Sequence, residues 1–533
     1  MNLQFSASKK LFYFYVAFAA IVILALALRL PKLAQRPMHT DEAVHAVKFA
    51  QLLEQHTYHY NPFEFHGPKL VYATLISAWL QGQKTFADVT EQTLRFVPVI
   101  FGTALILILL LATTIFRKRT LLFAALLTTL SPAFVFYSRY YIMEILLVFF
   151  TFASMLCGYK YLQTKKLLWA IGTGLSLGLM HATKETCILV WFAMAVAIVL
   201  TMLLSKKNVR ALQDALNWRH VFIGAVAGIL VSMLLFSAFL HNPRGILDSI
   251  LTFKNYITRG IGGFQEHIYP WDQYFKWLLL TKCAARPLWT EVFIFILAIP
   301  GFFGIFSQRH LSDEAKPFLQ FLAFYTLVLT LIYMLLPYKT PWSLLGFYHG
   351  FILIAAVGVN MLHTWARYTL SKIFLILMLA IGIAHLTWQS WQLNFKYAAD
   401  DSNPYVYSHT DNDFYRLVDG IKEITSYWPE NKNTFIEVVC PDSDYWPLPW
   451  YLRDYTNVAY SCEFDFNLPA GTLIVTMPTL EGDLLKKLFE IPPPGQRNMY
   501  IPFFDHGIRL RPGVEIDLYV RKDVWDEWYR RSP

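Results

Sequence analysis

Two adjacent acids, Asp41 and Glu42, lie between His39 and His45 near the start of the chain. Thr40 can cap a helix, and both acids then fall in its first turn, where peptide N–H groups favour ionised carboxylates. A carboxylate that stays ionised near neutral pH can act as a general base. Ordinary helix capping would also explain the pair. These residues therefore predict either a catalytic base or a plain helix start, and the rest of the chain decides between the two.

Apolar side chains recur at helical spacing behind the acids, at Ala43, Val47, Ala50 and Leu53. This spacing predicts an amphipathic helix that lies on a membrane surface. The preceding apolar segment, residues 11–30, is long enough to span a bilayer and shows no small-residue cleavage site. We therefore expect a retained transmembrane helix that delivers the acids to the membrane surface.

The composition supports a polytopic membrane protein. Of the 533 residues, 56% are hydrophobic and only 16% are charged, and the mean hydropathy is +0.38. A soluble enzyme of this size would be less apolar. The formal net charge is +9, but the basic residues form short clusters between apolar segments, so we expect no nucleic-acid partner.

About eleven apolar segments are each long enough, at roughly 20 residues, to cross a bilayer. Short basic loops such as residues 117–119 and 165–166 fall on one side of this topology. The positive-inside rule assigns that side, with the N-terminus, to the cytoplasm. Loops 31–90 and 241–288 and the tail after residue 390 then share the external face. The expected spans are 11–30, 93–115, 120–137, 143–162, 167–183, 186–204, 221–240, 289–306, 318–336, 343–362 and 371–390.

The chain divides into a transmembrane domain, residues 1–390, and an extracytoplasmic domain, residues 391–533. The tail is polar, and strand-like runs at 434–439, 458–463 and 472–477 alternate with helical stretches near 414–425 and 483–490. This alternation predicts a small α/β domain. Its aromatic run, residues 444–451, could stack on a sugar, although packing against the membrane domain is favoured.

Five cysteines show neither zinc-site spacing nor a disulfide framework. Cys440 and Cys462 end two expected strands, 435–440 and 458–462, and the segment between them suits a crossover that joins neighbouring parallel strands. Such strands lie about 4.8 Å apart, within reach of a disulfide. Two reduced thiols packed in the sheet remain the alternative.

Four basic residues lie in external turns, against the positive-inside trend: Lys69, Arg139, Lys184 and Lys339. Long side chains at span ends can snorkel to lipid headgroups, which is the simplest alternative for any one of them. Charged groups at membrane depth are costly and are functional candidates. A bound external anion would explain why several cations gather on this face.

The order of the motifs resembles that of GT-C membrane glycosyltransferases, in particular glycosyltransferase family 39, the protein O-mannosyltransferase and aminoarabinose-transferase branch. Its nearest subfamily is the flippase-associated one of archaeal N-glycosylation. The residues that carry the resemblance are Asp41-Glu42, Gly67-Pro68-Lys69-Leu70, Ser131-Pro132, Ser138-Arg139, Glu144 and Thr183-Lys184. The stretches Asp41 to His45, His66 to Pro68 and Tyr338 to Trp342 suggest the subfamily.

This resemblance implies a GT-C-like fold and an inverting transfer from a polyprenyl-phosphate-linked sugar to a lipid, glycan or protein acceptor. Asp41 matches the acid that deprotonates the acceptor hydroxyl, Glu144 the second acid, and Lys69 and Lys184 the basic residues near the lipid phosphate. We expect Glu42 to be a weaker catalytic candidate. The remaining site candidates are Arg139 and Lys339 for the phosphate, and His66, Tyr338 and Trp342 for substrate.

Two alternatives remain open. Asp41, His45 and Glu144 could converge on a divalent metal, since His45 lies one turn beyond Asp41 on the same helical face. The protein could also be a lipid-linked saccharide flippase or transport accessory, in which the basic residues merely hold a phosphate. Transport would distribute charges along the spans, whereas here they crowd at one face, which favours an enzyme.

Overall fold

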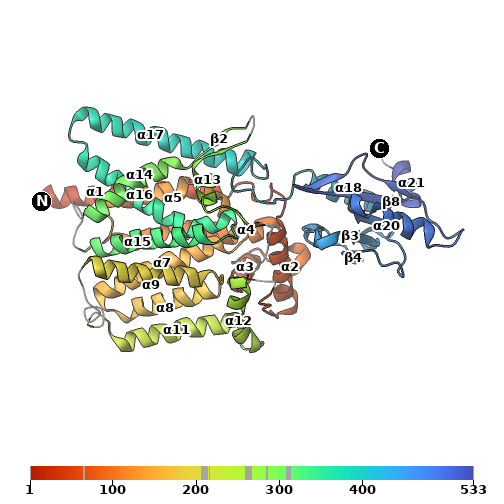
Figure 1. Cartoon of the computed structure of the whole chain (residues 1–533), viewed down its shortest axis with the longest axis horizontal. Helices are drawn as coiled ribbons and strands as arrows, with labels where there is room; N and C mark the ends of the chain where they lie inside the picture. Colours follow the sequence, from red (N-terminus) through yellow and green to blue (C-terminus); the bar gives the residue numbers. More distant parts are fainter. Residues whose placement is uncertain are drawn as a thin grey trace.

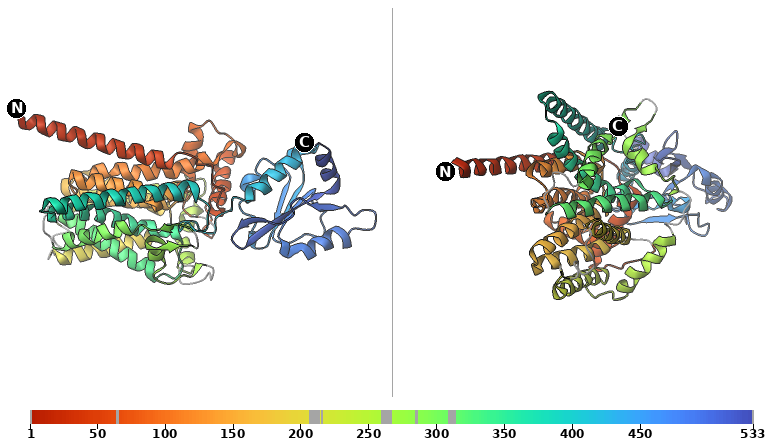
Figure 2. Two further views of the ribbon diagram at one scale, coloured as in Figure 1. Left: turned by 90° about the horizontal axis from the view of Figure 1, so that it is seen from above. Right: turned by 60° about the vertical axis from the view of Figure 1, so that its left-hand side comes forward.

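The computed structural model describes residues 2–63, 66–205, 214, 216–258, 267–283, 286–307 and 314–531. A bundle of long helices occupies one end of the molecule and a domain with a β-sheet occupies the other, while short helices lie between them (Figure 1). The N-terminus lies at the end of the bundle farthest from the sheet (Figure 2).

Eight helices in the described part of the chain are long and apolar enough to cross a membrane. They correspond to eight of the expected spans, so the chain is a multi-pass membrane protein. The eight are α1 (Asn2–Arg29), α4 (Glu91–Leu107, continued by η2, Ile108–Ala112), α7 (Glu144–Thr164), α9 (Cys187–Leu204), α11 (Trp218–Phe236), α15 (Lys316–Leu335), α16 (Leu345–Trp365, preceded by η5, Pro341–Leu344) and α17 (Thr369–Trp391).

Three further expected spans differ from the prediction. The segment 120–137 is broken into α5 (Lys118–Leu130) and α6 (Pro132–Tyr137), because Pro132 has no N–H to continue a helix and instead starts a new one after Ser131. The other two are shorter apolar helices, α8 (Leu167–His181) and α14 (Val292–Ser307). Of the eleven expected spans, eight are thus long apolar helices in the described part of the chain, and the other three are shorter or interrupted helices.

Four short helices lie at the end of the bundle that faces the sheet domain: α2 (Thr40–Gln55), α3 (Lys69–Leu80), α12 (Arg244–Thr258) and α13 (Gln273–Leu279) (Figure 1). The amphipathic helix expected after the acids is α2, and its residues Ala43, Ala50 and Leu53 are buried. Its N-cap is His39 rather than Thr40. This helix therefore carries the two acids at the junction of the two parts of the molecule.

The C-terminal sheet has the order β4-β3-β5-β8-β6, with β7 paired to β8. The three predicted strands are confirmed, as is the parallel pairing expected of β3 and β4; the parallel pairing of β3 with β5 and the antiparallel half of the sheet were not predicted. The strands are β3 (Ile436–Val439), β4 (Val458–Ser461), β5 (Leu473–Thr476), β6 (Tyr500–Pro502), β7 (Ile508–Arg511) and β8 (Val514–Arg521), and the main helices are α18 (Phe414–Tyr427), α19 (Leu448–Tyr451), α20 (Glu481–Leu485) and α21 (Lys522–Arg531).

Cys440 and Cys462 directly follow the paired ends of β3 and β4, where Val439 lies opposite Ser461. Their predicted adjacency is thus confirmed. Both are free thiols, Cys440 buried and Cys462 exposed. Burial raises the pKa of the Cys440 thiol to about 12, so this thiol is protonated and unreactive near neutral pH.

Candidate active site

Two turns pack against each other to build one side of the site. The Lys69 backbone N–H donates to the Ala182 carbonyl at 2.9 Å. A Cβ atom at Gly67 would lie only 2.3 Å from the same oxygen, so glycine is required at this position. The crossing brings His66 and Lys69 beside the turn that follows α8, which carries the predicted Lys184.

Glu42 is completely buried in a network of donors. Its carboxylate accepts from Arg95 Nε at 2.8 Å and Nη2 at 2.6 Å, and from Arg36 Nη2 at 3.2 Å. It also accepts from the backbone N–H groups of Tyr141 at 2.8 Å and His39 at 3.1 Å. Burial alone would raise the pKa of Glu42, but the two guanidinium charges overcome it and lower that pKa to about 2. These contacts favour a structural role for Glu42 over the catalytic role predicted for it.

Asp41 is the accessible member of the pair. Its side chain is 44% exposed, and its nearest basic atom is His39 Nδ1, 3.9 Å from Oδ2. The Asp41 backbone N–H donates to that same Nδ1 at 3.0 Å, which caps the helix. The carboxylate therefore projects from the N-terminus of α2 and is open to a substrate.

Two histidines, His45 and His66, lie close to each other near the start of α2 and α3. The rings of His45 and His66 lie 6.1 Å apart, and burial lowers the pKa of His45 to about 4, so it is neutral. His66 Nδ1 lies 2.6 Å from Glu185 Oε1 and 2.8 Å from the Tyr256 hydroxyl. Sequence reasoning missed Glu185 and Tyr256. The only sequence signal for Glu185 was its position next to Lys184.

The predicted second acid and one predicted phosphate ligand bind each other. Lys184 Nζ donates to Glu144 Oε1, and both side chains are buried. Glu144 Oε2 has no hydrogen-bond partner among the described residues. The ion pair joins the start of α7 to the turn after α8. Lys184 could therefore contact a bound anion only while it also remains paired with Glu144.

Arg139 and Lys339 bind helix ends. Arg139 Nη1 donates to the carbonyls of Arg29 at 2.8 Å and Pro31 at 2.7 Å, at the end of α1. Lys339 Nζ donates to carbonyls at the end of α15, among them Met334 at 3.1 Å. Helix C-termini leave carbonyls unpaired and favour cations. The helix ends therefore supply the partners of these two cations.

Lys69 differs from the other three predicted phosphate ligands. Within the described ranges, no acid or carbonyl pairs with its ammonium group, which lies 6.0 Å from the centre of the Phe101 ring. Burial lowers the pKa of Lys69, because a partly desolvated ammonium is less stable without a counter-charge. An anion next to Lys69 would supply that counter-charge.

The two predicted aromatic substrate ligands, Trp342 and Tyr338, contact different neighbours. The Trp342 ring is 6.1 Å from His39 and 5.7 Å from Tyr407, and its side chain is buried. The Tyr338 ring is 5.0 Å from the His267 ring. Trp342 therefore packs against the back of the helix cap, whereas Tyr338 pairs with loop 241–288.

The residues around the acids do not form a metal site. Among the described residues, no group of three His, Cys, Asp or Glu side chains is placed to share an ion. The predicted set of Asp41, His45 and Glu144 is therefore not brought together among the described residues, and Glu144 pairs with Lys184 instead. The alternative of a metal bound by these three residues is not supported.

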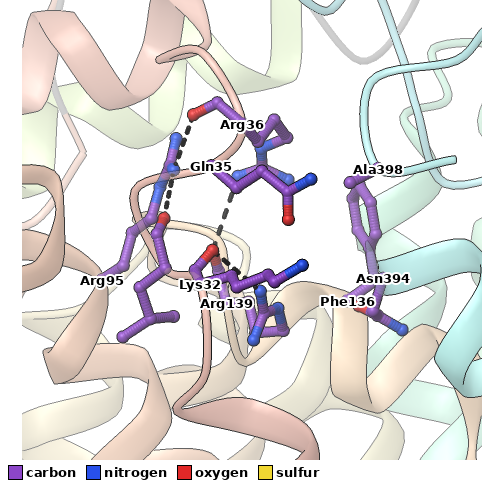
Figure 3. A pocket seen from close by; sticks show the side chains of 9 residues that line it. Lys32, Gln35, Arg36, Arg95, Phe136, Arg139, Asn394 and Ala398 are labelled. Atoms are coloured by element: carbon purple, nitrogen blue, oxygen red, sulfur yellow. Dashed lines mark hydrogen bonds between the residues drawn. The ribbon is translucent and has the colours of Figure 1, made fainter. Parts of the chain in front are cut away.

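A small cationic pocket is lined in part by Arg36 and Arg95, the two arginines that bind Glu42 (Figure 3). Arg95 Nη1 donates from its wall to the carbonyls of Leu33 at 2.6 Å and Arg36 at 2.9 Å, and Arg139 Nη2 donates to the Lys32 carbonyl at 3.2 Å. The guanidinium groups thus fix the loop between α1 and α2. The lining residues are Lys32, Leu33, Gln35, Arg36, Arg95, Phe136, Arg139, Asn394 and Ala398.

Comparisons with known proteins agree with this architecture. Residues 19–242 match the family model "Dolichyl-phosphate-mannose-protein mannosyltransferase", which covers under half of the chain. Among curated proteins, none matches the chain.

Similar folds occur in two solved membrane transferases. ArnT from Cupriavidus metallidurans in the apo state has a TM-score of 0.61 at 12% identity, over 96% of this chain and 98% of that one. The same enzyme was solved bound to undecaprenyl phosphate, with a TM-score of 0.59 at 12% identity over 94% and 97% of the two chains. The oligosaccharyltransferase AglB from Archaeoglobus fulgidus, in complex with an inhibitory peptide and a dolichol-phosphate, has a TM-score of 0.54 at 12% identity, over 97% and 77%.

Proposed function

We propose that this chain, a membrane glycosyltransferase of the GT-C superfamily, moves a sugar from a polyprenyl-phosphate donor to an acceptor hydroxyl outside the cytoplasm. Similar structures were solved with undecaprenyl phosphate or a dolichol-phosphate, which supports a lipid phosphate as the leaving group. The acceptor is a lipid, a glycan or a protein. The N-terminus is cytoplasmic in this proposal, and α2, α3 and the sheet domain share the external end (Figure 1).

Asp41 is the general base in this proposal. The observation that carries the assignment is the difference between the two adjacent acids: Glu42 is buried by Arg95 and Arg36, whereas the Asp41 carboxylate is 44% exposed. Asp41 takes the proton of the acceptor hydroxyl while the acceptor oxygen forms a bond to the anomeric carbon. The bond from that carbon to the phosphate oxygen breaks on the opposite face, so the configuration inverts and polyprenyl phosphate leaves.

The phosphate binds beside the crossing of the two turns. Lys69 supplies a cation there whose charge no described acid neutralises. His66 lies three residues before it and is anchored through Nδ1 by the buried Glu185, which leaves Nε2 for substrate. Charge-assisted hydrogen bonds of this kind are roughly twice as strong as neutral ones. Lys184 adds positive potential while it remains paired with Glu144.

Turnover by the purified full-length protein in lipid nanodiscs tests the proposal. The substrates are a panel of polyprenyl-phosphate sugars that includes dolichyl-phosphate mannose, and the readout is release of polyprenyl phosphate. Asp41→Asn should lower turnover by about two to four orders of magnitude, the usual contribution of general-base catalysis. Asp483→Asn is the matched control, because Asp483 is also an exposed acid in the first turn of a helix.

Unchanged turnover in Asp41→Asn would remove the assignment of the base. If the wild-type protein binds undecaprenyl phosphate but releases no lipid phosphate from any donor of the panel, the transport-accessory alternative replaces the enzymatic proposal. Absence of both binding and turnover would overturn the lipid-phosphate donor itself.

A further inference from the structure

Met38, three positions before Asp41, is held on both sides by the C-terminal part of the chain. The Met38 backbone N–H donates to the Tyr451 hydroxyl oxygen at 2.9 Å. The Thr410 hydroxyl donates to the Met38 carbonyl at 2.7 Å. Tyr451 belongs to α19 and Thr410 precedes α18, so both groups come from the C-terminal region.

His39, the next residue, links the same region to the Asp41 backbone. Its Nδ1 accepts from the Asp41 N–H at 3.0 Å, so Nε2 must carry the ring proton and donate it to the Tyr407 carbonyl at 3.0 Å. Only the neutral ring can make both bonds. Burial lowers the pKa of His39, against the opposing charges of Asp41 and Glu42, and so keeps the ring neutral.

The third residue, Thr40, is contacted by the edge of the sheet. Arg511 Nη1, at the end of β7, donates to Thr40 Oγ1 at 3.4 Å and to the Trp446 carbonyl at 3.2 Å, while Nη2 forms an ion pair with Asp444. Residues 38, 39 and 40 are thus each bound by the C-terminal region. These contacts end one residue before the proposed base.

We propose that the C-terminal domain acts as a positioning element for Asp41, through the contacts of Met38, His39 and Thr40. The inference rests on the proposed function and assigns a role to a domain that carries none of the predicted catalytic groups. A loop on a membrane surface would otherwise let the helix start move relative to the donor. A misplacement of about 1 Å can cost a hundredfold in rate, so fixing three consecutive residues matters for kcat.

Single-group variants on both sides of the contact test this role. His39→Ala removes the cap and the bond to Tyr407, and we expect kcat to fall by about a hundredfold. His39→Asn restores a capping oxygen but does not reach Tyr407, so it should recover only part of that loss. Tyr451→Phe keeps the ring and removes one acceptor, and it should lower kcat by about tenfold, the effect of one hydrogen bond of about 1.4 kcal/mol.

The measurements separate positioning from binding and from folding. Turnover is measured with dolichyl-phosphate mannose, or with whichever donor of the panel the wild-type protein uses, and affinity with undecaprenyl phosphate. We expect affinity to stay within about twofold of wild type, because the phosphate site involves other residues. Tyr455→Phe is the control, since its hydroxyl bonds only Thr425 of the same domain among the contacts described here, at 2.8 Å.

Wild-type kcat in both His39→Ala and Tyr451→Phe, while Asp41→Asn is inactive, would overturn the positioning role and leave the proposed function intact. An equal loss of kcat and of undecaprenyl phosphate affinity would also overturn it, since it would reveal a general loss of structure. If His39→Ala fails to fold, Tyr451→Phe decides alone. An active Asp41→Asn would refute the proposed function instead.

Discussion

Glu42→Gln removes one negative charge from the centre of the loop that holds Asp41. The side chain is fully buried and lies within 3.2 Å of donors from both Arg36 and Arg95. Glutamine has nearly the same shape, so the substitution leaves packing almost unchanged. It does leave two buried guanidinium groups without a counter-charge.

The expected cost follows from this burial. Removing one partner of a buried ion pair typically costs about 3–5 kcal/mol, because the remaining charge is not compensated. The two arginines lower the pKa of Glu42 to about 2 despite its burial. A carboxyl pKa that is lower in the folded state means that the ionised side chain stabilises the fold at neutral pH. We therefore expect the free energy of unfolding to drop by about 3 kcal/mol or more. The double variant Glu42→Gln/Arg95→Met should recover part of this loss, because it also removes one unpaired cation.

Unfolding of the purified protein in detergent, followed by tryptophan fluorescence, measures the stability of each variant. Asp41→Asn is the matched control, since it changes the neighbouring acid at an exposed position and should shift stability by less than about 0.5 kcal/mol. The reasoning is refuted if Glu42→Gln unfolds like the wild type but loses turnover as Asp41→Asn does. That result would make Glu42 the base.

Three further predictions follow from the site and the sheet. Lys69→Ala should weaken the binding of undecaprenyl phosphate by about tenfold or more in a titration, whereas Lys339→Ala, which frees the carbonyls at the end of α15, should lower stability with little effect on affinity. Because burial lowers the pKa of His45 from 6.5 to about 4, the unfolded state binds the extra proton between these values. Stability should therefore fall as the pH drops from 6.5 to 4, by up to about 3 kcal/mol, and His45→Gln should flatten this part of the unfolding profile. Cys440 and Cys462 should both be alkylated in the denatured protein without reductant, because both are free thiols and Cys440 is buried, and a disulfide-linked peptide in mass spectrometry would contradict this expectation.

The local sequence pattern identified only part of the C-terminal sheet. Short apolar runs between turn signals were enough to find β3, β4 and β5; β3 and β5 are fully buried parallel strands, which are nearly continuous hydrophobic segments, whereas β4 is a partly exposed edge strand. The antiparallel strands β6, β7 and β8 were missed. Polar and apolar residues alternate in β8, but its neighbours are only three and four residues long, too short for periodicity to identify.

The partners of the four cations could not be predicted from the sequence. The expected sidedness singled out Lys69, Arg139, Lys184 and Lys339, because a charged group at membrane depth needs a compensating partner. It could not say whether that compensation is a ligand, an acid or a helix end. Arg139 binds carbonyls more than 100 residues away in sequence, and Lys184 pairs with Glu144 across 40 residues.

The sequence by itself determined that the chain crosses a membrane repeatedly and that two acids begin a helix after the first span. Apolar length and helix-start chemistry are local properties, so they can be read along the chain. Only the tertiary structure decided which acid is buried. Successive helical side chains point about 100° apart, and Glu42 alone faces Arg95 and the Tyr141 backbone, which arrive from distant elements. The same packing leaves Asp41 exposed, and no described Lys or Arg forms an ion pair with its carboxylate, whose nearest ring nitrogen is that of the neutral cap, His39, at 3.9 Å.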